Sequence, residues 1–552
     1  MRRLLCVTGG ILLFAGGISA HHAHPVYGGE TLAPIASTSE TDAQAAIEVG
    51  LKLEQQRRWT DAINHYESAA REAADNATLQ QRLLICRLHH DVQRRYQDSS
   101  FLQSVSEFGT QQALDLYAEM LANMDTHYVD GVDWRKLIRH GSASLEVALT
   151  EPLFVDRLLA DARPEAIEEF RLNVHRHVIN RDVKSRHDLR AIAAHVAGLA
   201  KQDLGLSGSA TVLEFACGAL SALDTYSRFL TPGQLDETFS NIEGNFVGLG
   251  VELKVVENRL QILSVIPGGP AAEAALSPGD SIVQVEQTLT SEAGPDQAAD
   301  LLRGPEGSSV SLVLLDVDGQ QRKVRVQRRR VDVPCVENVH LVDAESGIGY
   351  LRLTNFQKTT SREVEQALWD LHRQGMKSLI IDVRGNPGGL LSAAVEIADR
   401  FITSGRIVTT RGRNARENFD YSAHRANTWS IPLAVLIDAD SASASEIFAG
   451  AIHDHARGRL VGQTSYGKGS VQGIFRMQTA KCGLCLTTAK FYSPSGAMIS
   501  DRGVAPDVVV EPGYIAARPN DQGVITREVD DNVLQQAMQT IRGENRLSSL
   551  PR

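Results

Sequence analysis

Three serines alternate with alanines in SASASE, residues 441–446, a few residues after the apolar run IPLAVLI. Ser443 and Glu446 match a capping box, in which a hydroxyl and a carboxylate accept hydrogen bonds from free backbone N–H groups at the start of a helix. A serine with small neighbours at the positive end of a helix is also well placed to act as a nucleophile. The stretch alone leaves both interpretations open. The second requires a residue elsewhere in the chain that can act as the base for the serine.

The familiar base for a serine nucleophile is histidine, and the chain contains 17 histidines. His453 and His455, the nearest in sequence, lie further along the same predicted helix. At 1.5 Å per residue they are roughly 15–18 Å from Ser443, which is too far for proton transfer. We therefore expect both histidines to be surface residues.

Lys468, between two glycines in YGKGSVQ, is the stronger candidate base. An amine accepts a proton only when neutral, so the lysine pKa of about 10.4 must fall by roughly two to three pH units, at a cost of about 3–4 kcal/mol. Burial lowers a lysine pKa, and the amide of Gln472 could orient the amine without adding charge. The stretch also nearly spells a phosphate-binding P-loop, but Gly469 replaces the required Ser or Thr and a strand-like segment follows, so that interpretation fails.

The stretch IDVRGNPGGLLSAA, residues 381–394, is typical of a buried strand that ends in a Gly-Asn-Pro-Gly-Gly turn. Such a turn can aim a backbone amide of Gly388 or Gly389 at a reacting carbonyl group. Together with the amide of Ala444 it would form an oxyanion hole, in which the loss of one donor costs about 2.7–4 kcal/mol. The structural alternative is an ordinary turn between a strand and a helix.

Residues 246–330 predict a small barrel with two short helices, because β-rich segments alternate with turns. Within it, VGLGV resembles the carboxylate-binding loop of PDZ domains. In those domains successive amides bind the terminal carboxylate of a peptide that adds a strand to the sheet. The predicted substrate-binding residues are Gly248, Leu249, Gly250 and Val251.

The remaining segments predict two different architectures. From residue 346 onward strands and helices alternate, which is typical of an α/β layer fold with a largely parallel sheet, and a tail helix closes the chain. The first third is helical. Residues 45–77 match a tetratricopeptide-type helix pair at Gly50, Trp59 and Tyr66, although a plain helical hairpin explains the pattern equally well.

Length and composition set the broad class of the protein. A chain of 552 residues predicts three or four domains, and 43% apolar with 22% charged residues is typical of a soluble globular protein. The net charge of −11 argues against nucleic acid or an anionic membrane surface as the main partner. Residues 1–20 predict a secretory signal, with Arg2 and Arg3 before an apolar stretch and small residues up to Ala20. An uncleaved membrane anchor is the alternative.

The cysteines do not predict a zinc site. Cys482 and Cys485 form a C-x-x-C pair, but no second pair stands at zinc-finger spacing. The strand-like residues after Cys485 predict a hairpin turn, with the question of a disulfide left open. Cys86, Cys217 and Cys335 are expected to be isolated core residues.

These features together resemble the carboxyl-terminal processing peptidases, or tail-specific proteases, which are exported serine proteases with a PDZ domain before or within a catalytic α/β region. The family places its serine in S-A-S-A-S-E, its lysine in G-K-G and a glutamine beyond it, with spacings of 25 and 4 residues that Ser443, Lys468 and Gln472 reproduce. The stretches GYLRLTNFQ, DVRGNPGG and TTAKFYSPSGAMISDRGVAPDV also match, and the resemblance covers residues 205–515.

The resemblance implies a multidomain protein of α/β and α+β class, with a helical N-terminal region, a PDZ domain and a crotonase-like α/β serine protease core. The predicted segments are a signal peptide, 1–20; a helical, tetratricopeptide-like unit, 21–100; the helical N-terminal region of the protease, 101–240; the PDZ domain, 241–330; the Ser/Lys protease core, 331–515; and a C-terminal helix and tail, 516–552.

The function that the resemblance implies is an exported serine endopeptidase, periplasmic or in the cell envelope, that cleaves proteins at or near unstructured C-termini. Lys468 would activate Ser443, Gln472 would orient the lysine, and neither a metal nor another cofactor is implied. The partners are protein or peptide substrates, while an adaptor at the helical region and a homo-oligomer stay open. One alternative is a non-catalytic PDZ scaffold, and the presence of Ser443, Lys468 and Gln472 together argues against it. The other is a crotonase-type acyl-CoA enzyme, and the PDZ segment and the signal argue against that.

Overall fold

The computed structural model describes residues 40–548, apart from residues 74, 180, 257–258, 294–297, 299–300, 425–427, 514–517, 520–524 and 527–530. The predicted signal peptide, residues 1–20, lies outside the described residues. The described chain divides into a helical unit, residues 40–235 together with Gln472–Thr488, and a core unit, Asp236–Val471 together with the described residues from Ala489 onward. Within the described ranges, no helix has the length and apolarity needed to cross a membrane.

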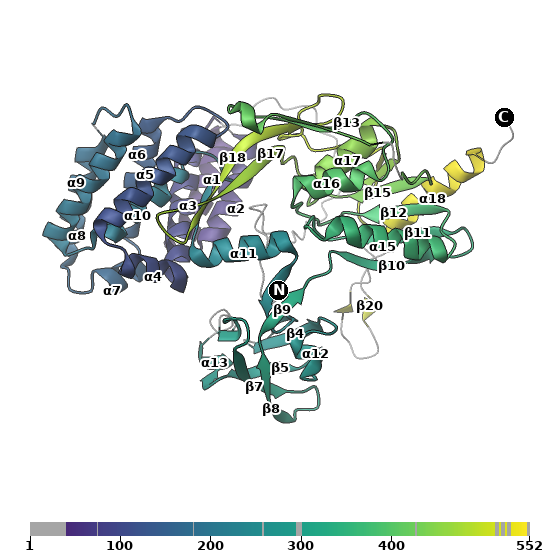
Figure 1. Ribbon diagram of the computed structural model, residues 1–552. Helices are drawn as coiled ribbons and strands as arrows, with labels where there is room; N and C mark the ends of the chain where they lie inside the picture. Colours follow the sequence, from purple (N-terminus) through teal and green to yellow (C-terminus); the bar gives the residue numbers. More distant parts are fainter. Residues whose placement is uncertain are drawn as a thin grey trace. The chain divides into compact units, whose positions relative to one another are not determined.

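Ten described helices make up most of the helical unit, coloured from purple to teal-blue in Figure 1. They are α1 (Glu40–Gln55), α2 (Trp59–Glu72), α3 (Ala77–Gln97), α4 (Ser99–Glu107), α5 (Thr110–His127), α6 (Trp134–Ala148), α7 (Pro152–Leu158), α8 (Pro164–Ile179), α9 (Arg186–Leu204) and α10 (Gly208–Leu220). Every residue of α10 is buried, because its sequence is apolar on nearly every side and α5, α6 and α9 pack around it. The structure therefore confirms the predicted helical N-terminal region.

Helices α1 and α2 form the hairpin predicted from residues 45–77. Gly50 of α1 lies directly against the ring of Tyr66 in α2, and a side chain at position 50 would collide with that ring. Tyr66 and Ala62 are completely buried in this contact region. Helix α3 covers the hairpin with Leu79 and further apolar residues, so the helix pair is stabilised by a third helix.

A hairpin of β17 (Ser470–Arg476) and β18 (Gly483–Tyr492) is divided between the two units. Residues 472–488 belong to the helical unit, where β18 pairs with β1 (Arg228–Leu230). The carboxylate of Glu119 in α5 accepts hydrogen bonds from the N–H groups of Gln478 and Thr479, at 2.7 and 3.0 Å. The helical unit thus holds the turn of a hairpin that begins directly after the predicted catalytic lysine.

The five cysteines that the structure describes are all buried. Cys86, Cys217 and Cys335 are core residues, as predicted. Cys482 and Cys485 lie at the turn and in β18 of the hairpin, as the strand-like sequence predicted, and no disulfide joins them.

A two-stranded ribbon, β2 (Asn245–Gly248) paired with β9 (Arg329–Asp332), begins and ends the predicted PDZ segment. Between these strands lie β3 (Val251–Val256), β4 (Arg259–Val265), α12 (Pro270–Glu273), β5 (Ser281–Val285), β6 (Thr288–Leu289), α13 (Thr290–Ala293), β7 (Ser309–Leu315) and β8 (Gln321–Gln327). The strand order is β3-β4-β5-β7-β8, with β6 beside β5. Strand β3 is therefore an edge strand among the described residues.

The core unit contains a six-stranded sheet in the order β10-β11-β12-β15-β16-β19. Its strands are β10 (Val336–Asp343), β11 (Ile348–Leu353), β12 (Ser378–Asp382), β15 (Leu433–Ile437), β16 (Arg459–Gly462) and β19 (Val508–Val509). The neighbours from β11 to β19 are parallel, and β10 is antiparallel to β11. This arrangement confirms the predicted α/β layer fold.

Helices cover both faces of this sheet. One face packs against α15 (Thr360–Arg373), α16 (Leu391–Asp399) and α17 (Ala444–Asp454), and the other packs against α18 (Asn532–Ser548), the yellow helix in Figure 1. The other elements are α11 (Pro232–Glu243), β13 (Arg406–Arg411), η1 (Ala415–Glu417), β14 (Phe419–Ser422), β20 (Arg518–Pro519) and β21 (Ile525–Thr526). Because β12 and β15 are parallel neighbours, the turn after β12 and the loop after β15 meet at the same sheet edge.

Candidate active site

The loop after β15 leads into Ser443, the residue directly before α17. Its backbone has φ 55° and ψ −111°, which residues with a side chain rarely adopt. Strain of this kind at a sharp strand-to-helix turn is known from serine nucleophiles that are exposed at a sheet edge. Ser443 is half-buried, whereas its neighbours Ala442 and Ala444 are buried.

The two other serines of the stretch make structural hydrogen bonds. Ser441 is 1% exposed and donates its hydroxyl to the carbonyl oxygen of Val383 at 2.8 Å. Ser445 is 0% exposed and donates to the carbonyl oxygen of Asn386 at 2.9 Å. Ser443 is thus the one serine of the three that is open to solvent.

The turn after β12 lies against Ser443. A β-carbon at Gly388 would lie 2.8 Å from Ser443 Cβ and 2.9 Å from Ala444 N, and the φ of 105° at Gly388 also favours glycine. The N–H group of Gly388 donates to Asn386 Oδ1 at 2.9 Å, so this donor is already in use. Within the described residues, the N–H groups of Gly389 and Ala444 have no acceptor.

The loop that carries Lys468 is held by the buried carboxylate of Glu446. The main-chain N–H of Lys468 donates to Glu446 Oε2 at 2.9 Å, and the N–H of Ser443 donates to the same oxygen at 2.8 Å. The other oxygen, Oε1, accepts the hydroxyl of Ser465 at 2.6 Å and the N–H of Gly467 at 2.7 Å. The Lys468 side chain is 1% exposed. One carboxylate therefore fixes the main chain at both predicted catalytic residues.

Burial raises the pKa of Glu446 above its usual value, although its hydrogen bonds from Ser465, Gly467, Ser443 and Lys468 act in the opposite direction. The sequence predicted Glu446 only as one half of a capping box, and its bond from the Ser443 N–H confirms that half. Its contact with the lysine loop was missed, because Glu446 and Lys468 are 22 residues apart and no local pattern joins them. The bonds of Asn386 to the carbonyl oxygen of Leu353 and to the hydroxyl of Ser445 were also missed, because these partners are distant in the sequence.

Gln472 lies on β17 and belongs to the helical unit, where its Nε2 is 3.4 Å from Thr487 Oγ1. The strand after Lys468 agrees with the rejection of a P-loop, which requires a helix at that place. His453 and His455 lie at the end of α17, where His453 Nδ1 is 3.1 Å from Asp454 and His455 Nε2 is 2.7 Å from the Arg406 carbonyl oxygen.

The predicted carboxylate-binding loop runs from the end of β2 to the start of β3. The carbonyl groups of Leu249 and Gly250 accept hydrogen bonds from Ala271 and Ile266, at 2.8 and 2.9 Å, and Gly250 has a φ of 78°. In the part of the chain that the structure describes, the N–H groups of Leu249 and Gly250 have no acceptor. The loop thus combines spare donors with the free edge of β3.

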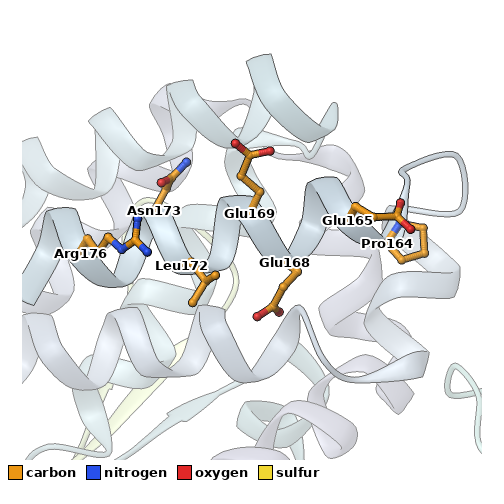
Figure 2. A pocket seen from close by; sticks show the side chains of 7 residues that line it. All are labelled: Pro164, Glu165, Glu168, Glu169, Leu172, Asn173 and Arg176. Atoms are coloured by element: carbon orange, nitrogen blue, oxygen red, sulfur yellow. The ribbon is translucent and has the colours of Figure 1, made fainter.

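A separate hollow of 640 Å³ lies along α8 in the helical unit (Figure 2). Its described lining comes from this one helix and consists of Pro164, Glu165, Glu168, Glu169, Leu172, Asn173 and Arg176. Glu168 and Leu172 point to one side of the helix, and Glu169 and Asn173 to the other. None of the predicted site residues lines it.

Two parts of the chain match models of known families. Residues 347–510 match peptidase family S41, and residues 240–315 match the PDZ domain. The first match contains the predicted Ser443 and Lys468, and the second contains the predicted carboxylate-binding loop.

The chain is also similar to individual proteases. It is 36% identical over 301 residues to the carboxy-terminal-processing protease of Bartonella bacilliformis, covering 53% of this chain and 68% of that protein. It is 34% identical over 303 residues to the carboxyl-terminal-processing protease of Synechocystis sp., covering 54% and 70%. Among solved structures, a photosystem II D1 C-terminal processing protease has 25% identity and a TM-score of 0.39, over 72% of this chain and 93% of that one. The chain therefore belongs to the carboxyl-terminal processing proteases of peptidase family S41, which are serine-type peptidases with a PDZ domain.

Proposed function

We propose that Ser443 and Lys468 form the catalytic dyad of an acyl-enzyme mechanism. The observation that carries this proposal is Glu446 Oε2, which accepts the main-chain N–H groups of both residues. The burial of Lys468 adds to it, because burial disfavours an ammonium ion and a base must be neutral. Gln472, four residues beyond Lys468, has the role of orienting the amine in this proposal.

The reaction proceeds in two proton-coupled steps. Ser443 Oγ bonds to the scissile carbonyl carbon while Lys468 Nζ takes the hydroxyl proton, and the carbonyl electrons move to oxygen. Collapse of this oxyanion breaks the C–N bond, and Lys468 gives the proton to the leaving nitrogen. Water then attacks the ester, Lys468 takes a proton from it, and this proton returns to Ser443 as the acid is released.

Two main-chain N–H groups stabilise the oxyanion in this proposal. Ala444 supplies one of them from the start of α17, where the helix dipole also favours negative charge. The turn after β12 supplies the other. Of its two glycines we favour Gly389 as the donor, because the N–H of Gly388 is bonded to Asn386.

We further propose that the enzyme selects unstructured protein C-termini through its PDZ domain. The spare N–H groups of Leu249 and Gly250, followed by the free edge of β3, suit a peptide that ends in a carboxylate and adds one strand. The net charge of −11 opposes anionic ligands, so this local group of amides has to supply the attraction. Export of the protein is supported by residues 2–20, in which basic residues are followed by an apolar stretch and then by small residues.

Single alanine substitutions at the three serines test the dyad. Ser443→Ala removes the nucleophile, so peptide hydrolysis should fall at least about 10³-fold, while the free energy of unfolding changes by about 1 kcal/mol. Ser441→Ala and Ser445→Ala are matched controls, because each removes one buried hydroxyl and leaves Ser443 in place. Both controls should lose far less activity than Ser443→Ala, because neither removes the nucleophile. An active Ser443→Ala enzyme would refute the proposal.

Amidation of a substrate C-terminus tests tail recognition. Amidation of a long unstructured substrate, or addition of Asp-Asp to its end, should slow cleavage several-fold, because the loop amides then lose their carboxylate. Short peptides that do not engage the PDZ domain serve as the control and should be cleaved at similar rates in both forms. Equal rates for the free-acid and amidated long substrates would leave an endopeptidase without tail recognition.

A further inference from the structure

The guanidinium of Arg384 lies directly before the turn formed by residues 385–389, which we call the oxyanion turn. Its Nε and Nη2 donate to Asp382 at 3.0 and 2.6 Å, and its Nη1 and Nη2 donate to Asp531 at 2.8 Å each. Asp382 is the last residue of β12 and also accepts the hydroxyl of Tyr350 at 2.8 Å, so it links Arg384 to the sheet. Among the described residues, Asp531 is the only distant hydrogen-bond partner of this guanidinium, 147 residues away in sequence.

Asp531 is itself fixed by the C-terminal helix α18. Its Oδ1 accepts the N–H of Leu534 at 3.0 Å, so the same carboxylate caps the helix and holds Arg384. The helix packs Val533, Ala537 and Ile541 against the sheet. Burial favours a higher pKa at Asp531, but the bonds from Arg384 and Leu534 bring its pKa below the usual value, so the carboxylate is charged at neutral pH.

The oxyanion turn is in direct contact with the segment around Ser443. The carbonyl oxygen of Asn386, two residues after Arg384, accepts the N–H of Ala442 at 3.0 Å and the hydroxyl of Ser445 at 2.9 Å. These two residues flank Ser443 on either side. A displacement of Arg384 would therefore reach the nucleophile and the glycines of the turn through one short piece of chain.

We infer that Asp531 is a positioning residue for the peptidase reaction, because it clamps Arg384 and so makes the placement of the oxyanion turn depend on the docking of α18. The inference rests on the proposed Ser443 mechanism. Asp382 already neutralises the charge of Arg384, so the contribution of the second carboxylate is geometric. Two opposed carboxylates leave the planar guanidinium one orientation. Asp531 lies outside residues 347–510, the part that matches the peptidase family.

The test uses the full-length enzyme with Asp531→Asn and, as a second variant, Asp531→Ser. Both side chains cap a helix nearly as well as aspartate, so α18 keeps its start, but neither offers a carboxylate to Arg384. Arg542→Gln is the matched control. It breaks the ion pair of Arg542 with Asp343, a 2.6 Å contact elsewhere on α18 that does not involve the turn. Hydrolysis of a short peptide gives kcat and KM, and a peptide aldehyde of the same sequence gives the affinity for a tetrahedral adduct.

We expect the Asp531 variants to lower kcat at least tenfold with KM changed less than twofold, because misplacement of about 1 Å can cost a factor of about 100 in rate. Aldehyde affinity should fall by the same factor as kcat/KM, whereas Arg542→Gln should change each quantity less than twofold. Equal effects of the Asp531 and Arg542 variants, or an effect on KM alone, would overturn the inference. If Ser443→Ala is inactive and Asp531→Asn is fully active, this inference fails alone. An active Ser443→Ala enzyme would instead refute the mechanism beneath it.

Discussion

Two carboxylates, Glu214 in the helical unit and Glu446 in the core unit, are both completely buried but have different hydrogen-bond partners. Glu214 accepts hydrogen bonds from Arg95 Nη2 at 2.7 Å and from the hydroxyl of Ser144 at 2.8 Å. Glu446 accepts four hydrogen bonds from neutral donors, which are three main-chain N–H groups and one hydroxyl. The first carboxylate is paired with a cation, and the second holds the backbone at Ser443, the proposed nucleophile, and at Lys468.

Both carboxylates are buried, so burial alone does not distinguish the structural ion pair from the proposed proton-transfer site, whereas their hydrogen-bond partners do. Burial acts to lower the pKa of Arg95, but the acidic groups around it, of which Glu214 acts most strongly, together raise that pKa. A guanidinium therefore stays charged, which suits a permanent structural pair. The buried cationic residue near Glu446 is a lysine, and an amine can lose its proton.

Lys468→Arg tests this comparison most strongly, because it introduces a guanidinium, the cation that pairs with Glu214, at the candidate active site. We expect peptide hydrolysis to fall at least about 10³-fold, as far as in Lys468→Ala, since a guanidinium with a pKa above about 12 cannot accept the serine proton. The measurement is kcat/KM for a short peptide. An active arginine variant would mean that Lys468 acts through its charge. Gln472→Ala should be milder if Gln472 only orients the amine.

Glu446→Gln tests whether the neutral donors need a carboxylate. In glutamine an NH2 group replaces one carboxylate oxygen, and it cannot accept the hydrogen bonds that this oxygen accepted. We therefore expect kcat to fall by about 10² and the free energy of unfolding by about 2–4 kcal/mol. Ser465→Ala is the matched control, because it removes one donor to Glu446 and touches neither Ser443 nor Lys468. An unchanged kcat in Glu446→Gln would show that this carboxylate does not position the dyad.

Glu214→Gln should have the smallest effect on the chemistry. It leaves the guanidinium of Arg95 buried without its carboxylate, so we expect the free energy of unfolding to fall by about 3–5 kcal/mol. Hydrolysis by the folded enzyme, measured well below the unfolding midpoint, should change less than about twofold because Glu214 contacts none of the proposed catalytic groups. A loss of kcat as large as in Glu446→Gln would contradict the purely structural role of this pair.

Local patterns in the sequence predicted most of the fold. Alternating strands and helices after residue 346 predicted the parallel sheet, and the β-rich segment with its VGLGV loop predicted the PDZ domain. The grouping of residues 472–488 with the helical unit and the small hairpin of β20 and β21 were not predicted. Each depends on contacts between distant parts of the chain or on strands of two residues, which leave no periodicity.

The sequence by itself determined that a serine stands at a helix start, that a glycine-flanked lysine follows 25 residues later, and that a glycine turn ends a buried strand. These are properties of residue type and spacing, which act over a few neighbours. Tertiary structure alone decided which serine is open to solvent. It also decided that one oxygen of Glu446 accepts the N–H groups of Ser443 and Lys468, and that Asp531 binds the guanidinium of Arg384. The reason is physical: a hydrogen bond forms between groups that folding brings within about 3 Å, whatever their separation along the chain.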